Sequence, residues 1–225
     1  MDEQGAEPAA EIEEAPPPDW RRTMWAMVGI QFIMTLSFTI LSPIMPLFLP
    51  ELGVTGAAHI DLWAGILNGT TSFVAAFASP LWGRIADQRG RKLMLLRSSF
   101  AIGFFTVLMG LSLNVWQFFG ARALMGAFAG FSASAIALVA SQVPEERLGY
   151  ALGWLSTGQL VGGLVGPVLG GFLSDLSGSY RVPFFCTAAI CFVAMGLAWA
   201  FVREHFTPPA QAGRGRSMLS ALRLL

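Results

Sequence analysis

The chain has 225 residues, a formal net charge of zero, 54% hydrophobic residues and only 12% charged ones. About a quarter of the residues of an ordinary soluble domain are charged, so this composition excludes a soluble enzyme or binding domain of that kind. It suits a chain that lies in hydrocarbon, and the zero net charge gives no reason to expect a nucleic-acid partner.

Residues 1–19 form an acidic tail that is rich in Pro and Ala. We expect this tail to be disordered, because it can bury too little apolar surface to offset the entropy cost of ordering. It is not a cleavable signal, since it lacks the basic start and the short apolar run of one.

Six apolar runs follow, at about 24–49, 62–82, 93–113, 116–140, 151–174 and 183–202. A bilayer core about 30 Å thick requires about 20 apolar residues per helix, and each run meets that length. In lipid the backbone polar groups must be satisfied within the segment, so the runs are predicted to be helices. The predicted fold class is an all-α integral membrane protein, with residues 20–203 as one six-helix bundle and residues 204–225 as the start of a cytoplasmic linker.

The basic residues of the short connections predict the orientation in the membrane. One side has only Arg181, and the other side has Arg21, Arg22, Arg84, Arg89, Arg91, Lys92, Arg97, Arg147, Arg203, Arg214, Arg216 and Arg223. Basic residues favour the cytoplasmic side. We therefore expect a multi-pass protein of the plasma membrane (the inner membrane of a bacterial cell) with both ends of this segment in the cytoplasm.

The connection between the second and third runs reads Gly83-Arg84-Ile85-Ala86-Asp87-Gln88-Arg89-Gly90-Arg91-Lys92. It resembles the loop motif of the major facilitator superfamily of transporters, although Gln88 stands where that family prefers Arg or Lys. The resemblance implies a conformational latch formed by Gly83, Asp87, Gly90, Arg91 and Lys92, in which Asp87 pairs with the other half of the transporter and Arg91 belongs to the same charge network. Simple anchoring of positive charge at the inner surface would explain Arg91 and Lys92, but neither Asp87 nor the two glycines.

The end of the fifth run repeats this spacing with Gly171, Asp175 and Gly178. The second and fifth runs cross the membrane in opposite directions, so the pattern predicts a 3+3 inverted repeat, which is one half of a 12-helix major facilitator fold. Chance is the alternative, because Gly and Asp are common at helix ends.

Arg122 and Gly126 lie in the fourth run. An arginine inside a membrane helix is costly and therefore points to a function. The family has an Arg-x-x-x-Gly at this place, and the resemblance implies a role in proton coupling. The alternative is that Arg122 extends toward the outer interface.

The fifth run carries Gly153, Gly158, Gly162, Gly166, Pro167, Gly170 and Gly171. This string resembles the antiporter signature of drug:proton exporters. Four glycines at four-residue spacing form one smooth face, and Pro167 removes a backbone hydrogen bond, so we expect a kinked hinge helix. Generic glycine packing of membrane helices is the alternative.

Together these features predict a secondary active transporter that exports small amphipathic drugs by alternating access, coupled to protons. A symporter or uniporter for a sugar or organic acid is the alternative, and an enzyme is not expected. Gln31, Asn68 and Gln159, with Ser132, either line a substrate cavity or form hydrogen bonds between helices. The first, fourth and fifth runs have no Asp or Glu in their interiors, so we expect the proton carrier in a second six-helix bundle. No cofactor or metal is expected, and Cys186 and Cys191 are interpreted as small buried residues.

Overall fold

A computed structural model describes residues 20–202 and 204, and all regular structure in this part is helical. The helices are α1 (Trp20–Ile40), α2 (Ile44–Phe48), the short 3-10 helix η1 (Leu49–Leu52), α3 (Ala57–Arg89), α4 (Arg91–Leu111), α5 (Val115–Ala127), α6 (Phe131–Gln142), α7 (Glu145–Ser177) and α8 (Val182–Phe201). The predicted disordered tail, and the predicted linker apart from Glu204, lie outside the described residues.

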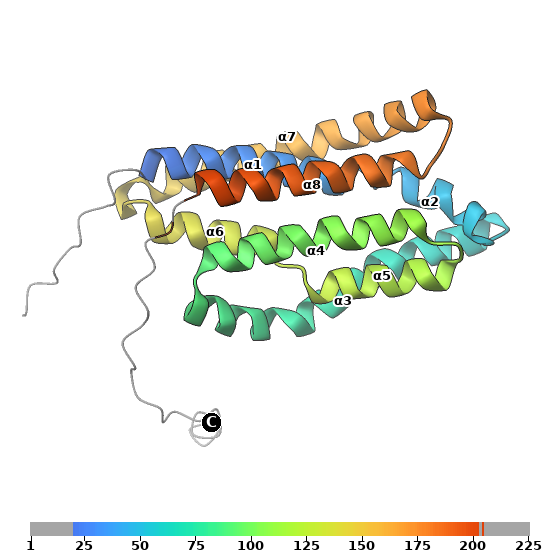
Figure 1. The fold of residues 1–225 in the computed structure, drawn as a ribbon, viewed down its shortest axis with the longest axis horizontal. Helices are drawn as coiled ribbons and strands as arrows, with labels where there is room; N and C mark the ends of the chain where they lie inside the picture. The colour runs from blue at the N-terminus through green and yellow to red at the C-terminus, as the bar shows by residue number, and fades with distance from the viewer. Residues whose placement is uncertain (1–19, 203, 205–225) are drawn as a thin grey trace, which may run out of the picture.

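The helices combine into the six predicted spans, which lie side by side in one bundle (Figure 1). The first span is α1, α2 and η1 together, and the fourth is α5 followed by α6. Five stretches of the described chain are long and apolar enough to cross a membrane: Trp20–Leu52, Arg91–Leu111, Val115–Gln142, Glu145–Ser177 and Val182–Phe201. The remaining span, α3, has 33 residues and packs beside α5, but a polar stretch at residues 68–72 lowers its mean hydropathy.

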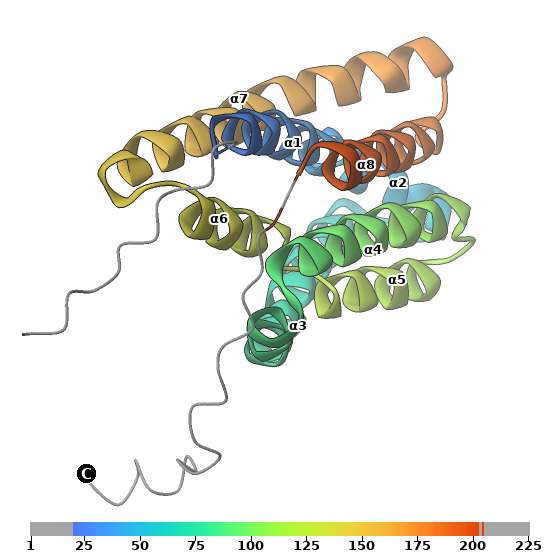
Figure 2. The ribbon, with the colours of Figure 1, turned by 60° about the vertical axis from the view of Figure 1, so that its left-hand side comes forward.

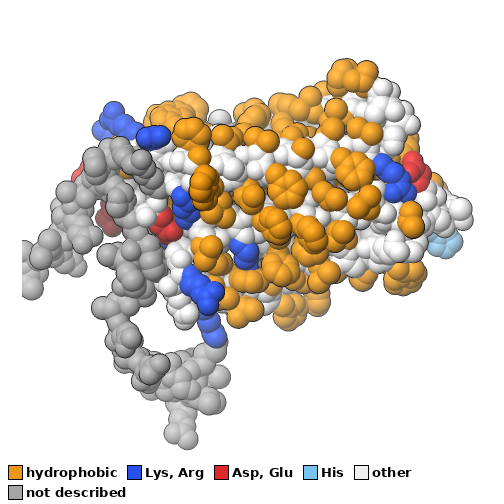
Figure 3. Space-filling model, in the orientation of Figure 1, with side chains coloured by type: hydrophobic (Ala, Val, Ile, Leu, Met, Phe, Trp, Pro, Cys, Tyr) orange, Lys and Arg blue, Asp and Glu red, His pale blue; other side chains and the backbone are white. Residues whose placement is uncertain are grey.

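The third span is sandwiched in the bundle, whereas the second is peripheral. Figure 2 shows α1 between α7 and α8, and α4 beside α8 and α5, in agreement with the neighbours that each helix contacts. Ten residues of α4 are buried, but Leu67 is the single buried residue of α3. Hydrophobic side chains cover the middle of the face in Figure 3, and most charged ones lie toward the two ends, as expected for a bundle in lipid.

The two halves of the bundle correspond element by element. Both α3 and α7 have 33 residues, and each ends at a glycine with positive φ, which is +91° at Gly90 and +62° at Gly178. Such a backbone conformation is open to glycine and costly for other residues. Each is followed after a short turn by a shorter helix, α4 or α8, as an inverted repeat of three spans requires.

The prediction of a loop between the second and third spans is wrong, because nearly all of the motif is helical. Helix α3 continues to Arg89 and α4 starts at Arg91, so Gly90 alone lies outside the helices. A helix of 33 residues is about 50 Å long, which exceeds a bilayer core of about 30 Å. Helix α3 therefore extends beyond the apolar run in the sequence, and the motif forms a helical corner.

Candidate functional site

The corner between α3 and α4 binds a carboxylate that comes from the residues just after α8. The backbone N–H groups of Arg91 and Lys92 donate to Oε1 and Oε2 of Glu204, at 2.7 and 2.8 Å. A Cβ atom on Gly90 would lie 2.8 Å from Oε2 of Glu204, so the glycine leaves the space that this carboxylate occupies. Negative charge is favoured at a helix N-terminus, where backbone N–H groups lack partners. Glu204 thus caps α4 and ties it to the end of α8.

The basic side chains of the corner bind backbone carbonyls. Nη1 of Arg91 donates to the carbonyl of Ala137 on α6, and Nζ of Lys92 donates to the carbonyl of Trp199 on α8 at 3.0 Å. Among the described residues, Asp87 and Arg91 form no ion pair. Asp87 and Gly83 are exposed, and nothing lies within 4 Å of a Cβ placed on Gly83. The corner therefore presents a carboxylate and a small residue outward, while its cations hold it to α6 and α8.

The fourth span is broken at residues 128–130, between α5 and α6. Gly130 has a φ of +119°, and the carbonyls at the break are bound by side chains of the two preceding spans. Nε1 of Trp82 donates to the carbonyl of Ala127 at 2.6 Å, and Nη2 of Arg97 donates to the carbonyls of residues 128 and 129 at 3.3 Å each. Cζ of Arg97 lies 3.4 Å from the centroid of the Trp82 ring, as in a cation–π contact.

This arrangement is not predicted by the sequence, in which Arg97 counts among the basic residues of the inner surface. Arg97 lies six residues past Arg91 in α4, which is about 9 Å along the helix axis. The available signal was an arginine inside an apolar run, the same signal that identified Arg122.

Arg122 is directed into the bundle. It is 5% exposed, and its Nη2 donates to Oδ1 of Asn68 at 3.0 Å. Its Cζ lies 5.8 Å from the ring centroid of Phe38. One turn further along α5, a Cβ on Gly126 would lie 2.6 Å from the carbonyl oxygen of Thr71. The pair Arg122 and Gly126 thus marks a close crossing of α5 and α3, and Arg122 does not extend to the outer interface.

The polar candidates for a substrate cavity fall into two groups. Nε2 of Gln31 is 3.3 Å from Oγ of Ser132 and 3.5 Å from Oε1 of Gln159, which connects α1, α6 and α7. Gln31 is buried, and its Oε1 has no hydrogen-bond partner among the described residues. Asn68 is engaged instead with Arg122.

The glycine face of α7 is seated on the backbone of α1. A Cβ on Gly158 would lie 2.9 Å from the carbonyl oxygen of Val28, and one on Gly162 would lie 2.7 Å from that of Phe32. A Cβ on Gly166 would meet Leu36 and Thr39, and one on Gly170 would meet the backbone of Ile40. All four glycines are buried. We call these four residues the glycine face.

The other members of the string lie elsewhere. Gly153 and Gly171 have nothing within 4 Å of a Cβ, so they lie off the glycine face. Pro167 lies inside α7, which remains one uninterrupted helix from Glu145 to Ser177. Oγ1 of Thr39 donates to the carbonyl of Gly162 at 3.1 Å, which adds a polar contact between α1 and α7.

The model of the Major Facilitator Superfamily matches residues 27–225 of this chain. The chain belongs to the major facilitator superfamily. It is 41% identical over 207 residues to a multidrug resistance protein MdtG from Yersinia enterocolitica, covering 91% of this chain and 50% of that protein. It is 44% identical over 197 residues to MdtG from Escherichia coli, covering 87% of this chain and 48% of that protein. The chain spans about half the length of the curated relatives it matches, and it corresponds to their N-terminal half.

Solved structures support the major facilitator fold. The human organic anion transporter MFSD10 (TETRAN) superposes with a TM-score of 0.74 at 18% identity, covering 85% of this chain and 49% of that one. An auto-inhibited POT family peptide transporter superposes with a TM-score of 0.68 at 18% identity, covering 84% and 39%. At this identity the likeness shows the fold alone. In this major facilitator bundle, the described residues contain no group of three or more His, Cys, Asp or Glu side chains that could hold a metal ion.

Proposed function

We propose that this chain is the first bundle of a carrier that exports small amphipathic drugs from the cytoplasm by alternating access, in exchange for protons. The observation that carries the proposal is the identity of 41–44% to multidrug resistance proteins over most of this chain. A second six-helix bundle would complete the carrier in the plasma membrane, with both ends of the present segment in the cytoplasm.

A second bundle would account for the surface of α3. This helix buries only Leu67, yet it is polar at residues 68–72, and the two turns that follow expose Phe73, Phe77 and Leu81. Polar groups are expensive against lipid but not against a cavity or another protein surface. Asp87 and Gly83, exposed at the cytoplasmic end of the same helix, would meet the second bundle and act as the latch.

The contact between α1 and α7 supports the hinge. Glycines allow two backbones to approach closely without interlocked side chains. The fifth span would change its tilt on α1 as access alternates, with Gly162 and Gly166 near the middle of the contact. Gly153 and Gly171 would serve the helix ends instead.

The polar groups inside the bundle would serve substrate and proton. Gln31, Ser132 and Gln159 join α1, α6 and α7. Oε1 of Gln31, which has no partner in the part of the chain that the structure describes, would accept a hydrogen bond from a substrate. Arg122, held by Asn68 and without a carboxylate partner in the described residues, would respond to a proton carrier in the second bundle.

Transport by the full-length protein in proteoliposomes tests the proposal. An amphipathic fluorescent cation should move against its gradient when a pH gradient is imposed. Gly162→Val should abolish that movement, because its side chain meets the backbone of α1, while Gly163→Val should retain it, because a Cβ there meets nothing within 4 Å. Inward accumulation of a sugar or organic acid, with no drug movement, would show that the alternative carrier function is correct.

A further inference from the structure

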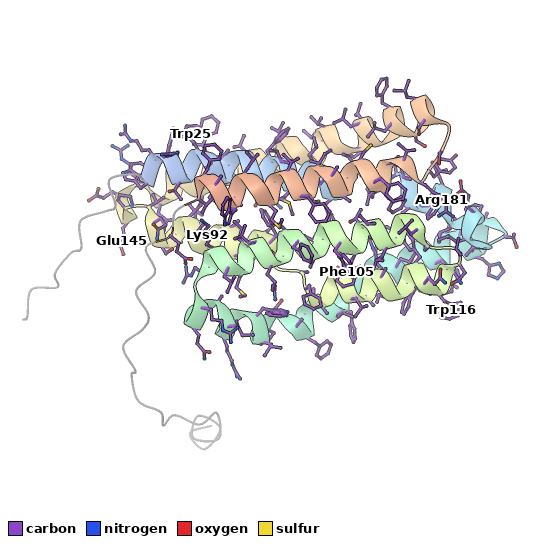
Figure 4. The ribbon with its side chains drawn as sticks, in the orientation of Figure 1. Trp25, Lys92, Phe105, Trp116, Glu145 and Arg181 are labelled. Atoms are coloured by element: carbon purple, nitrogen blue, oxygen red, sulfur yellow. The ribbon has the colours of Figure 1, made fainter. Side chains whose placement is uncertain are left out.

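An apolar groove of about 430 Å³ runs along the outside of the bundle between α1 and α8. Its walls are Arg22, Trp25, Ala26, Gly29, Ile30, Ile33, Leu197 and Phe201. Gly29 opens the groove, since a Cβ placed there would meet nothing within 4 Å. The volume lies in the range of small-molecule sites, about 300–1,000 Å³. Figure 4 places Trp25, which is 46% exposed, on the outer side of α1 near its N-terminus.

The groove is apolar along its length and cationic at one end. Arg22 closes the end near the first turn of α1, where its Cζ lies 5.9 Å from the ring centroid of Phe201. Arg21 is next to it, with its Cζ 5.4 Å from the Trp20 ring centroid. Both arginines are exposed, and neither forms an ion pair with a carboxylate of the described residues. The first turn of α1 contains no acidic residue.

The length of the groove matches one leaflet of a bilayer. Helix α1 rises about 1.5 Å per residue, so the stretch from Arg22 to Ile33 covers about 16 Å, roughly half of a hydrocarbon core of about 30 Å. A ligand for this site therefore needs an apolar chain of one leaflet's depth and an anionic group at the membrane surface.

We propose that the groove between α1 and α8 is a binding site for an anionic phospholipid. One acyl chain lies along Gly29 and Ile33, and the phosphate is bound by Arg22 with Arg21 beside it. Basic residues at the cytoplasmic ends of membrane helices attract anionic headgroups, and a guanidinium can bind two phosphate oxygens at once. The charge distinguishes this occupant from a zwitterionic lipid, which would fill the groove but gain little from the two arginines.

Quenching of Trp25 by brominated lipids measures occupancy of the groove. The whole chain is placed in vesicles of phosphatidylcholine that contain a small share of brominated phosphatidylglycerol, and in parallel vesicles where phosphatidylcholine carries the bromine. The difference between the wild type and Trp25→Phe isolates the signal of this tryptophan from the other six. We expect apparent association with phosphatidylglycerol to be about fivefold stronger than with phosphatidylcholine.

Two variants and one control make the test specific. Arg22→Gln should remove most of the fivefold preference, and Gly29→Leu should reduce the quenching by both lipids because its side chain fills the groove. Arg147→Gln removes an exposed arginine at the start of α7 and should change neither. Native mass spectrometry of the same proteins, with melting temperatures recorded for each, should show phosphatidylglycerol retained by the wild type and lost from Arg22→Gln.

The proposal is overturned if the two lipids quench Trp25 equally in the wild type. It is also overturned if Arg22→Gln prefers phosphatidylglycerol over phosphatidylcholine as strongly as Arg147→Gln does. A third outcome against it is that an amphipathic drug relieves the quenching by brominated phosphatidylcholine while unlabelled phosphatidylglycerol does not, since the groove would then be a drug site. Cross-linking of residues 205–225 into the groove would equally contradict it.

Discussion

The third and fifth spans contact their neighbours in opposite ways. Helix α4 is held by hydrogen bonds of charged groups at both ends and in between. Glu204 and Arg181 bind its two ends, and its own Arg91, Lys92 and Arg97 bind carbonyls of the neighbouring spans. Helix α7 rests on α1 through four glycines and exposes large apolar side chains such as Leu164 and Val168 on its other side. Directional hydrogen bonds must break before the helices that they join can shift, whereas the glycine face has no interlocked side chains that would have to separate. From this comparison we predict that α4 belongs to the frame of the bundle and that α7 is the span that moves.

The two ends of α4 are bound by groups of the sign that the helix dipole favours. Glu204 binds the N-terminal N–H groups, and Nη1 of Arg181 donates to the carbonyls of Gly110 and Ser112 at 2.8 and 3.0 Å. Figure 4 places Lys92, at the first of these ends, and Arg181, at the second, toward opposite ends of the bundle. Both capping groups flank α8, so α4 and α8 are joined as one unit.

The largest effect is expected from adding a side chain to the glycine face. Gly170→Leu would drive its side chain into the backbone of Ile40, which neither rotamer changes nor neighbouring side chains can relieve. Overpacking of this kind costs about 3 kcal/mol of folding free energy, and we expect transport to fall to background. Thermal unfolding of the purified protein, together with drug efflux from cells, measures both.

The adjacent glycine is the control for that variant. Gly171→Leu changes the same residue type one position later, where a Cβ meets nothing within 4 Å. It should unfold within about 0.5 kcal/mol of the wild type. Equal loss in the two variants would mean that α7 tolerates no bulk on any side, and the glycine face would have no special part.

A smaller effect is expected at the break in the fourth span. Arg97→Met keeps much of the apolar stem but leaves the carbonyls of residues 128 and 129 without their donor. We expect a loss of about 2 kcal/mol, because unsatisfied buried polar groups cost about 1–3 kcal/mol. Arg97→Lys should recover part of it, since an ammonium can donate to one carbonyl and still face the Trp82 ring. Unfolding curves of the wild type and the two variants measure these losses. If Arg97→Met is as stable as the wild type, the break does not depend on hydrogen bonds from α4.

The next effect is expected at the corner capped by Glu204. Glu204→Gln keeps the shape of the side chain and removes its charge, so the N–H groups of Arg91 and Lys92 lose a charge-assisted partner. We expect a loss of about 1 kcal/mol, as for other helix N-terminal caps. Glu145→Gln is the matched control, because Glu145 is exposed in the first turn of α7 and α7 has no side-chain cap. A larger loss in the control than in Glu204→Gln would contradict the assignment of the cap.

Sequence reasoning located the spans because apolar run length is set by the bilayer alone. It also found the glycine face, because four-residue spacing fixes one side of a helix whatever the partner is. The predicted hinge includes Gly153 and Gly171, because a sequence signature does not consider the angle of each residue around the helix axis. Gly171 follows Gly170 directly and therefore points away from α1. Neither the break at residues 128–130 nor the cap at Glu204 could be predicted, because the break lies inside a single run of membrane-spanning length and the cap requires α8 to lie beside α4. The latch role of Asp87 and the proton-coupling role of Arg122 stay predictions.

The smallest effect tests which contacts of Arg181 matter at the C-terminal end of α4. Nε of Arg181 lies 3.6 Å from Oε2 of Glu51, and the two side chains are 32% and 41% exposed. Ion pairs this exposed contribute little, so Glu51→Gln should cost less than about 0.5 kcal/mol. Arg181→Gln should cost about 1 kcal/mol, because it also removes the hydrogen bonds to the carbonyls of Gly110 and Ser112. Thermal unfolding of the two single variants and the double variant separates the contribution of the ion pair from that of the hydrogen bonds. If the double variant is as stable as Arg181→Gln, Glu51 stabilises the protein only by pairing with Arg181. A larger loss in Glu51→Gln than in Arg181→Gln would mean that the C-terminal end of α4 is held by surface charge, and the third span would then be less firmly anchored than its contacts indicate.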